Sequence, residues 1–176
     1  MGLKSTIDVS LLKPTDAWKL CDFMVTNENR LKKYLPLTLN RNLNPTLSQI
    51  FVADKLKLIE REEEFLYTLK LKSSRQLIGL IYLKNIDRNK GQGEFAYAID
   101  YRYQGQGIMP SAVYYLMAQQ HSLLGLQHYQ IIANKDNPAS IRVAEKCGFK
   151  WTKTLEREFE PPGKPAKDME LYELSI

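Results

Sequence analysis

A glycine-rich turn in the second half of the chain carries residue types that bind phosphate. Arg102-Tyr103-Gln104-Gly105-Gln106-Gly107 follows an apolar segment that we expect to be a strand, and a helical pattern begins directly after it. The first backbone N–H groups of a helix have no intrahelical acceptor, and the helix dipole adds partial positive charge there. Gly105 and Gly107 remove side chains that would block close approach to the backbone. Arg102 adds a permanent cation that can reach a phosphate or brace the loop. The turn therefore predicts a phosphate-binding loop.

Other phosphate-binding motifs do not fit this turn. A nucleotide P-loop needs Gly-Lys-Ser/Thr, which the turn lacks, and a dinucleotide fingerprint needs a third glycine where Pro110 stands. A glycine turn that merely joins a strand to a helix is the structural alternative. The turn alone does not separate that alternative from a phosphate site.

A second motif lies one predicted strand further along the chain. Asn134-Lys135-Asp136-Asn137-Pro138-Ala139-Ser140 is followed by Glu145-Lys146-Cys147-Gly148-Phe149. With the loop Arg102–Gly107, these segments resemble the GNAT superfamily of N-acetyltransferases: an Arg/Gln-x-x-Gly-x-Gly/Ala loop, an Asn-x-x-Ser helix start and a Glu-Lys-x-Gly-Phe helix end. Glu94-Phe95-Ala96-Tyr97, before the loop, looks most like the RimJ/RimL branch, which includes ribosomal-protein N-terminal acetyltransferases.

The resemblance implies a site for acetyl-CoA as cosubstrate, and no metal. The backbone of Ala98–Asp100 would bind the pantetheine arm like an added strand. The amides of Gln104–Ile108 would hold the pyrophosphate, and Asn137 would reach the pantetheine or phosphate region. The complete set of expected cofactor-binding residues is Ala98, Ile99, Asp100, Arg102, Gln104, Gly105, Gln106, Gly107, Ile108, Asn134, Asn137 and Lys146.

Two side chains are candidates for the proton transfers of acetyl transfer. An amine attacks the thioester directly in a ternary complex, so the reaction needs no Ser or Cys nucleophile. Glu94, on the predicted strand before the loop, can face the cleft as general base; a solvent-facing carboxylate or a salt bridge is an equal alternative. By the family match, Ser140 would lie near the sulfur as general acid, and its alternative is a capping hydroxyl. Tyr172 and Tyr97 are weaker candidate donors.

Hydrophobic periodicity and turn residues predict the elements that position these side chains. Strands are expected at residues 7–12, 65–71, 77–83, 95–101, 129–133, 149–159 and 169–174, and helices open near residues 14, 45, 109 and 137. Residues 27–44 are expected to be mostly irregular. This order predicts an α/β fold with a mixed, mostly antiparallel central sheet of about seven strands, flanked by about four helices. The GNAT resemblance adds a splay of the sheet at the fourth and fifth strands.

Local signals define several details of these helices. Thr15 or Asp16 is expected to cap the first helix, with Trp18, Cys21 and Val25 near one face. Asn137 is expected to cap the last helix, with Pro138 at its first position and Gly148 ending it in a left-handed conformation. One apolar stripe is expected on the helix after the loop: Met109, Ala112, Val113, Leu116, Met117 and Gln120.

Composition sets the remaining expectations. The 176 residues favour a single domain over residues 1–176. Cys21 and Cys147 have neither a metal nor a disulfide spacing, and we expect buried thiols. The net charge of +5 is mild and its basic residues are scattered, so no direct nucleic-acid binding is expected. No segment approaches the length of a membrane span, which predicts no membrane contact and a cytoplasmic protein. A homodimer is an expectation of the family resemblance.

The leading functional hypothesis is an N-acetyltransferase, an acyltransferase that uses acetyl-CoA. Its acceptor is a primary amine, either a protein N-terminal α-amine, as in ribosomal-protein acetyltransferases, or a small-molecule amine. The alternative is a catalytically weak CoA-binding sensor or scaffold module, which would keep the loop and Asn137. A nucleotide-binding regulator is disfavoured by the missing P-loop residues.

Overall fold

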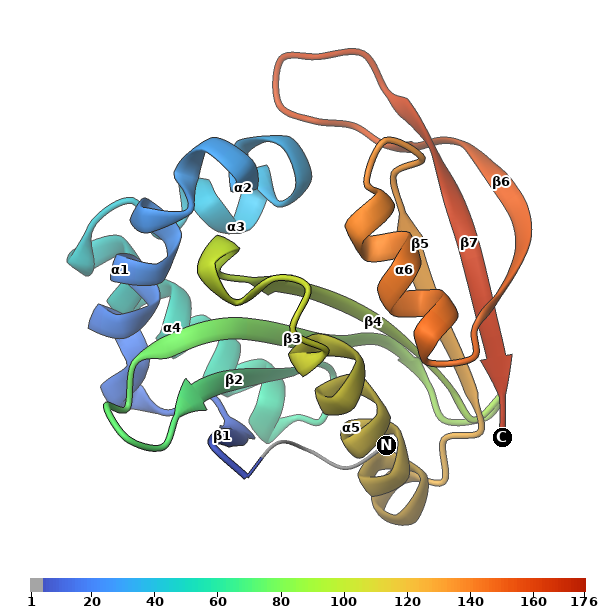
Figure 1. Cartoon of the computed structure of the whole chain (residues 1–176), viewed down its shortest axis with the longest axis horizontal. Helices are drawn as coiled ribbons and strands as arrows, with labels where there is room; N and C mark the ends of the chain where they lie inside the picture. The colour runs from blue at the N-terminus through green and yellow to red at the C-terminus, as the bar shows by residue number, and fades with distance from the viewer. Residues whose placement is uncertain (1–4) are drawn as a thin grey trace. The chain divides into compact units, whose positions relative to one another are not determined.

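A mixed seven-stranded sheet organises the described part of the chain (Figure 1). The computed structural model describes residues 5–176, so residues 1–4 of the predicted domain lie outside it. The sheet order is β1-β2-β3-β4-β5-β7-β6. The strands are β1 (Ile7–Leu11), β2 (Phe65–Leu71), β3 (Leu77–Asp87), β4 (Gln92–Ile99), β5 (His128–Ala133), β6 (Lys150–Phe159) and β7 (Lys167–Ser175). The helices are α1 (Ala17–Thr26), α2 (Glu28–Tyr34), α3 (Pro36–Asn40), α4 (Pro45–Glu60), α5 (Ile108–Leu124) and α6 (Pro138–Lys146). The predicted α/β fold is confirmed.

Strand β4 pairs with β5 along its first residues only. β4 and β5 are parallel, with Gln92–Phe95 opposite His128–Ile131, while β4 itself runs on to Ile99. At the end of β4, the Asp100 backbone N donates to Ile78 O of β3 at 2.8 Å. Backbone groups alternate in direction along a strand, so those of Ile99 point away from β3.

Two compact units share strands β3 and β4. The N-terminal unit extends to Tyr82 and includes Tyr97–Gln106. The C-terminal unit comprises Leu83–Ala96 and Gly107–Ile176. The single domain over residues 1–176 stays a prediction.

In the N-terminal unit, helix α1 packs by a different face from the one expected. Leu20, Cys21 and Met24 are buried, whereas Trp18 is 66% and Val25 47% exposed. Three-residue and four-residue spacing is satisfied by several stripes of this short helix, and the sequence did not decide among them. Asp16 stands at the N-cap of α1, as predicted, but its side chain makes no capping hydrogen bond to this helix. Its carboxylate instead lies 2.7 Å from Lys70 Nζ in a buried ion pair.

Two short helices occupy the segment that was expected to be irregular. α2 and α3 have seven and five residues, and each buries one leucine, Leu31 and Leu39 respectively. Helices this short show too few turns for a clear periodicity and depend on tertiary packing. The prediction of irregular structure over residues 27–44 is therefore wrong.

The C-terminal unit has the core that the sequence predicts. All six residues of the expected α5 stripe are buried. Tyr129 of β5 stacks on Phe95 with 5.4 Å between ring centroids, and its hydroxyl donates to Met117 O of α5 at 3.0 Å. β7 pairs antiparallel with both β5 and β6, and Figure 1 shows these three strands side by side. Burial raises the pKa of the Cys147 thiol to about 11, as expected of a packing residue.

Candidate active site

The glycine-rich loop forms a short 3-10 turn, two left-handed glycines and the start of a long helix. The turn covers Tyr101–Tyr103, and Gly105 and Gly107 have φ angles of +72° and +74°. Side chains at such φ angles are strained, which explains the two glycines. Apart from the neighbouring backbone of the chain, no atom of residues 5–176 lies within 4 Å of where a Cβ of either glycine would stand, so the space beside their backbone is open.

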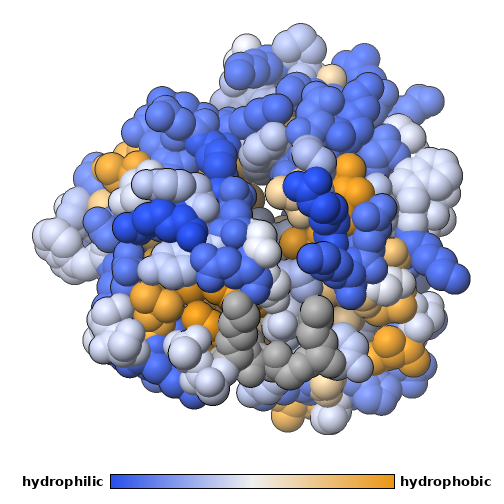
Figure 2. Space-filling model, in the orientation of Figure 1, coloured by the Kyte–Doolittle hydropathy of each residue, from blue (hydrophilic) through white to orange (hydrophobic). Residues whose placement is uncertain are grey.

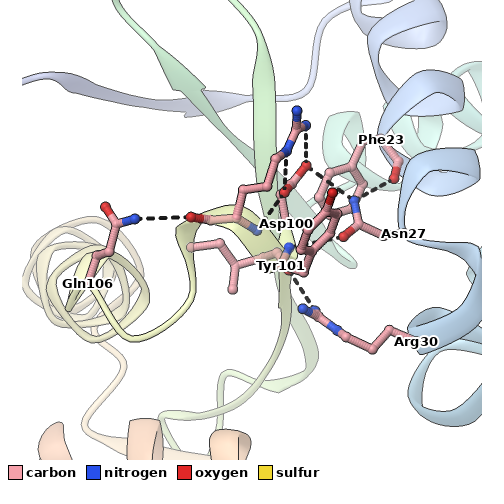
Figure 3. A network of polar contacts seen from close by, with 8 residues as sticks. Phe23, Asn27, Arg30, Asp100, Tyr101 and Gln106 are labelled. Atoms are coloured by element: carbon pink, nitrogen blue, oxygen red, sulfur yellow. Dashed lines mark hydrogen bonds and ion pairs between the residues drawn. The ribbon is translucent and has the colours of Figure 1, made fainter.

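A buried carboxylate holds this loop in shape (Figure 3). Asp100 is 1% exposed. Its carboxylate accepts from the Arg102 backbone N at 2.9 Å, from Arg102 Nε at 3.0 Å and from Arg102 Nη2 at 2.7 Å. The Arg102 hydrogen bond lowers the pKa of Asp100, because it stabilises the charged form. Arg102 was predicted either to reach a phosphate or to brace the loop, and in the structure its guanidinium group braces the loop by binding Asp100.

Helix α1 and the residue after it hold the same turn from the other side. Asn27, which is 3% exposed, donates from Nδ2 to Phe23 O at 2.9 Å and to Asp100 Oδ2 at 3.4 Å. Its Oδ1 accepts from the Tyr101 backbone N at 3.1 Å. Asn27 therefore joins the end of α1 to Asp100 and Tyr101, the two residues directly before Arg102, as Figure 3 shows. Because the contact spans 73 positions and Asn27 lies in no motif, the sequence did not indicate it.

Glu94, the candidate general base, lies within a polar cluster of the C-terminal unit. Its side chain is 6% exposed, and Oε1 is 3.0 Å from Lys84 Nζ. Oε2 accepts from Asn85 Nδ2 at 2.7 Å. Asn85 has a φ of +50°, a left-handed conformation that asparagine tolerates better than most residues. The salt bridge that was weighed as an alternative for Glu94 is thus present.

The start of α6 is closed by asparagine side chains. Asn137 Oδ1 accepts from the Ser140 backbone N at 3.2 Å, which confirms the predicted cap. Asn134 Oδ1 accepts from the Asp136 backbone N at 2.8 Å and so shapes the preceding turn. Pro138 occupies the first turn, and Gly148 follows the helix with a φ of +89°, both as predicted. Lys146 is exposed on the last turn.

The two units thus bring together different parts of the predicted site. Ala98–Gln106 lies with Asn27 in the N-terminal unit, whereas Glu94, Gly107, Asn137 and Ser140 lie in the C-terminal unit.

Burial raises the pKa of Tyr172, one of the two weaker donor candidates, which favours its neutral form. Among residues 5–176, no group of three His, Cys, Asp or Glu side chains could hold a metal ion. No helix in this range is long and apolar enough to cross a membrane.

Comparison with known proteins decides the family. The profile of the Acetyltransferase (GNAT) domain matches residues 9–150. The chain belongs to the GNAT acetyltransferase family.

Relatives of this GNAT protein are consistent with the RimJ/RimL branch. YdaF of Bacillus subtilis (strain 168), provisionally named a ribosomal N-acetyltransferase, is 29% identical over 147 residues, which cover 81% of this chain and 77% of YdaF. The structure of RimL, a ribosomal L7/L12 α-N-protein acetyltransferase in complex with coenzyme A, has a TM-score of 0.90 at 19% identity, covering 99% and 96% of the two chains. The microcin C7 self-immunity acetyltransferase MccE, in complex with acetyl-CoA and AMP, has a TM-score of 0.88 at 20% identity, covering 98% and 94%. The predicted family and GNAT fold are confirmed.

Proposed function

We propose that this GNAT protein transfers an acetyl group from acetyl-CoA to the α-amine of a protein N-terminus. The start of α5 is the observation that carries the cosubstrate part of the proposal. Its cap residue is Gly107, which has no side chain to satisfy the first amides of the helix, and the space beside it is open. A pyrophosphate placed there would receive these N–H groups and the positive end of the helix dipole.

The acyl-CoA arm would then run along the outer edge of β4. The backbone groups of Ile99 point away from β3, and the described β4–β5 ladder ends at Phe95 opposite Ile131. An extended arm with amide groups can add to such an edge as a strand does. In this proposal the amides of Gln104–Ile108 hold the pyrophosphate, and Asn134, Asn137 and Lys146 lie along the remainder of the cosubstrate.

Direct attack of an amine on the thioester requires alignment and two proton transfers. Alignment of the amine and thioester can remove roughly 7–11 kcal/mol of the barrier. Glu94 is the proposed general base, and its Oε1 lies 3.0 Å from Lys84 Nζ. Ser140, in the first turn of α6, is the proposed acid that protonates the thiolate.

Proton affinity favours an α-amine over a lysine as the acceptor. Deprotonating an α-amine of pKa about 8 costs about 1.4 kcal/mol at pH 7, whereas a lysine side chain of pKa about 10.4 costs about 4.6 kcal/mol. A single carboxylate such as that of Glu94, acting through water, suffices for the smaller cost. YdaF is provisionally named a ribosomal N-acetyltransferase, and RimL is named a ribosomal L7/L12 α-N-protein acetyltransferase. Both names agree with an α-amine acceptor.

A panel of amines tests the proposal. Thiol release from acetyl-CoA would be measured with N-terminal peptides, the same peptides with blocked N-termini, free lysine derivatives and small amines. We expect turnover with free N-terminal peptides and none with the blocked ones. Turnover confined to small amines would contradict the protein acceptor while leaving acetyl transfer intact.

The hydrogen bonds of Glu94 favour a second candidate function. Both carboxylate oxygens are engaged by Lys84 and Asn85, which is the arrangement of a structural carboxylate. If Glu94 has only this role, the protein is a CoA-binding sensor or scaffold with weak catalysis. Such a module would bind acetyl-CoA but release no thiol with any amine of the panel.

The variant Glu94→Gln separates these two candidates. A general base contributes about a hundredfold or more to kcat, and its loss matters most below neutral pH, where the amine is protonated. We therefore expect a lower kcat that recovers as pH rises, measured as a pH–rate profile. Lys84→Met is the companion variant because it breaks the same ion pair but keeps the carboxylate. An unchanged profile in Glu94→Gln would remove Glu94 from the mechanism.

A further inference from the structure

Two consecutive residues of β3, Lys84 and Asn85, contact the same carboxylate on the neighbouring strand β4. Lys84 Nζ lies 3.0 Å from Glu94 Oε1, and Asn85 Nδ2 donates to Glu94 Oε2 at 2.7 Å. Successive side chains of a regular strand point to opposite faces of the sheet, so two neighbours are not expected to reach one group. The backbone of β3 must therefore depart from the regular strand conformation at this point.

Asn85 supplies that departure. Its φ angle of +50° lies in the left-handed region, although β3 runs from Leu77 to Asp87 and so continues on both sides of it. A left-handed residue inside a strand interrupts the alternation and re-aims a side chain. Asparagine tolerates this region better than most residues, but a non-glycine residue there still costs free energy, and such strain clusters at functional sites. In this strand, the departure from regular backbone brings the Asn85 amide to Glu94.

The two contacts hold the Glu94 carboxylate without using all of its acceptor capacity. A carboxylate has about four lone-pair sites, so one contact on each oxygen leaves a site on each for a proton or for a water molecule that carries one. The side chain of Glu94 is 6% exposed and that of Lys84 is 36% exposed. Glu94 stands opposite Gln130 of β5, whose Nε2 donates to Glu173 Oε1 of β7 at 2.8 Å.

We propose that Asn85 is a positioning residue for acetyl transfer, whose amide fixes the rotation of the Glu94 carboxylate for proton transfer. The proposal rests on the role of Glu94 as general base in the function proposed above. The last torsion of a glutamate side chain is broad, and one ion pair to one oxygen does not fix it. A donor on each oxygen does fix it. Asn85 takes up no proton itself and acts only through Glu94.

The variant Asn85→Gly separates the side chain from the backbone. Glycine adopts a left-handed φ without strain, so the path of β3 is kept while the donor to Glu94 is lost. With the best acceptor of the amine panel, we expect kcat to fall about tenfold and the KM for acetyl-CoA to stay unchanged, because only orientation in the chemical step is lost. Steady-state kinetics measures both constants, and thermal unfolding should show a folded variant.

A double-variant cycle shows whether Asn85 acts through Glu94. If it does, Asn85→Gly should lower kcat in the wild-type background and have no further effect in Glu94→Gln, because the base that Asn85 orients is then absent. An equal loss of kcat in both backgrounds would show a general effect on the strand and would overturn the proposal.

Asn89 provides the matched control in the turn that follows β3. It is an exposed asparagine of the same hairpin, and Asn89→Gly should leave kcat unchanged. A loss equal to that of Asn85→Gly would assign the effect to hairpin flexibility and would also overturn the proposal.

Full activity of Asn85→Gly would refute the role of Asn85 alone. If this variant does not fold, as judged by circular dichroism, Asn85→Asp takes its place, because aspartate tolerates the same φ and its carboxylate has no N–H donor. The same fall in kcat is then expected, and full activity has the same meaning. A wild type that releases no thiol with any amine would instead refute the proposed function, which keeps the two failures distinguishable.

Discussion

The two strand–loop–helix connections of the C-terminal half start their helices in opposite ways. α5 begins after Gly107, a left-handed residue without a side chain, and the space beside the Cβ position of Gly107 is open. α6 begins after Asn137, whose side chain accepts from the Ser140 backbone N, with Pro138 directly following. Among the described residues, a side chain caps the start of α6, whereas no side-chain cap hydrogen bond is present at the start of α5.

The two connections also differ in the range of their contacts. The loop before α5 is held at its start by Asp100 and by Asn27, a residue that is distant in sequence. The cap at the start of α6 is local, because Asn137 accepts from a backbone N three residues further along the chain. The side of the molecule seen in Figure 2 is largely hydrophilic, with hydrophobic residues in small separate groups.

The largest expected effect comes from the loop glycine. Gly107→Val places a β-branched side chain at a φ of +74° and beside the proposed pyrophosphate. Losing two charge-assisted hydrogen bonds of about 2 kcal/mol each corresponds to about a thousandfold weaker acetyl-CoA binding. Titration calorimetry measures this loss.

Gly125 is the matched control at the other end of α5. It has a φ of +67° and an equally open Cβ position. Gly125→Val should cost similar stability in thermal unfolding and leave acetyl-CoA affinity unchanged. Equal affinity losses in both variants would mean that helix distortion, and not the loop, is responsible.

The next effect concerns Ser140 in the closed helix start. If its hydroxyl protonates the thiolate, Ser140→Ala should lower kcat by about a hundredfold and leave the KM for acetyl-CoA unchanged. Steady-state kinetics with the best peptide of the amine panel measures both constants. The Ser140 backbone N, which Asn137 caps, is present in the variant, so stability should change little. Full activity would reject the role of Ser140 as general acid.

A smaller effect is expected from removing the carboxylate behind the open loop. Asp100→Asn cannot accept the same set of hydrogen bonds from Arg102, and we expect acetyl-CoA affinity to fall about tenfold. A group with a lowered folded-state pKa stabilises above its unfolded pKa of about 3.9 and loses that contribution as pH falls through the folded pKa.

Urea unfolding at two pH values checks the sign of this effect. The wild type should be more stable than Asp100→Asn at pH 7, and the difference should shrink at pH 3. A difference that is independent of pH would show that the Asp100 charge does not stabilise the loop.

Local signals in the sequence predicted the features that depend on a few neighbouring residues. The glycines at 105 and 107, the Asn137 cap and the α5 stripe each follow from backbone sterics or helical spacing. Contacts between distant segments were not predictable in this way. Asn27 and Asp100 are 73 positions apart, and α2 is too short to show a pattern, so the network behind the loop was missed. The roles of Glu94 and Ser140 depend on ligands as well as on the chain, and they stay predictions.

The smallest expected effect asks whether the closed helix start also contacts the cosubstrate. Asn137→Asp keeps a side-chain oxygen that can accept from the Ser140 N but loses the amide donor. If that amide reaches acyl-CoA, the variant should keep its thermal stability and bind acetyl-CoA roughly fivefold more weakly, the value of one neutral hydrogen bond. Asn137→Ala should in addition lose about 1 kcal/mol of stability with the cap. Unchanged affinity in Asn137→Asp would confine Asn137 to capping, and α5 would then be the sole helix start of this pair that serves the ligand.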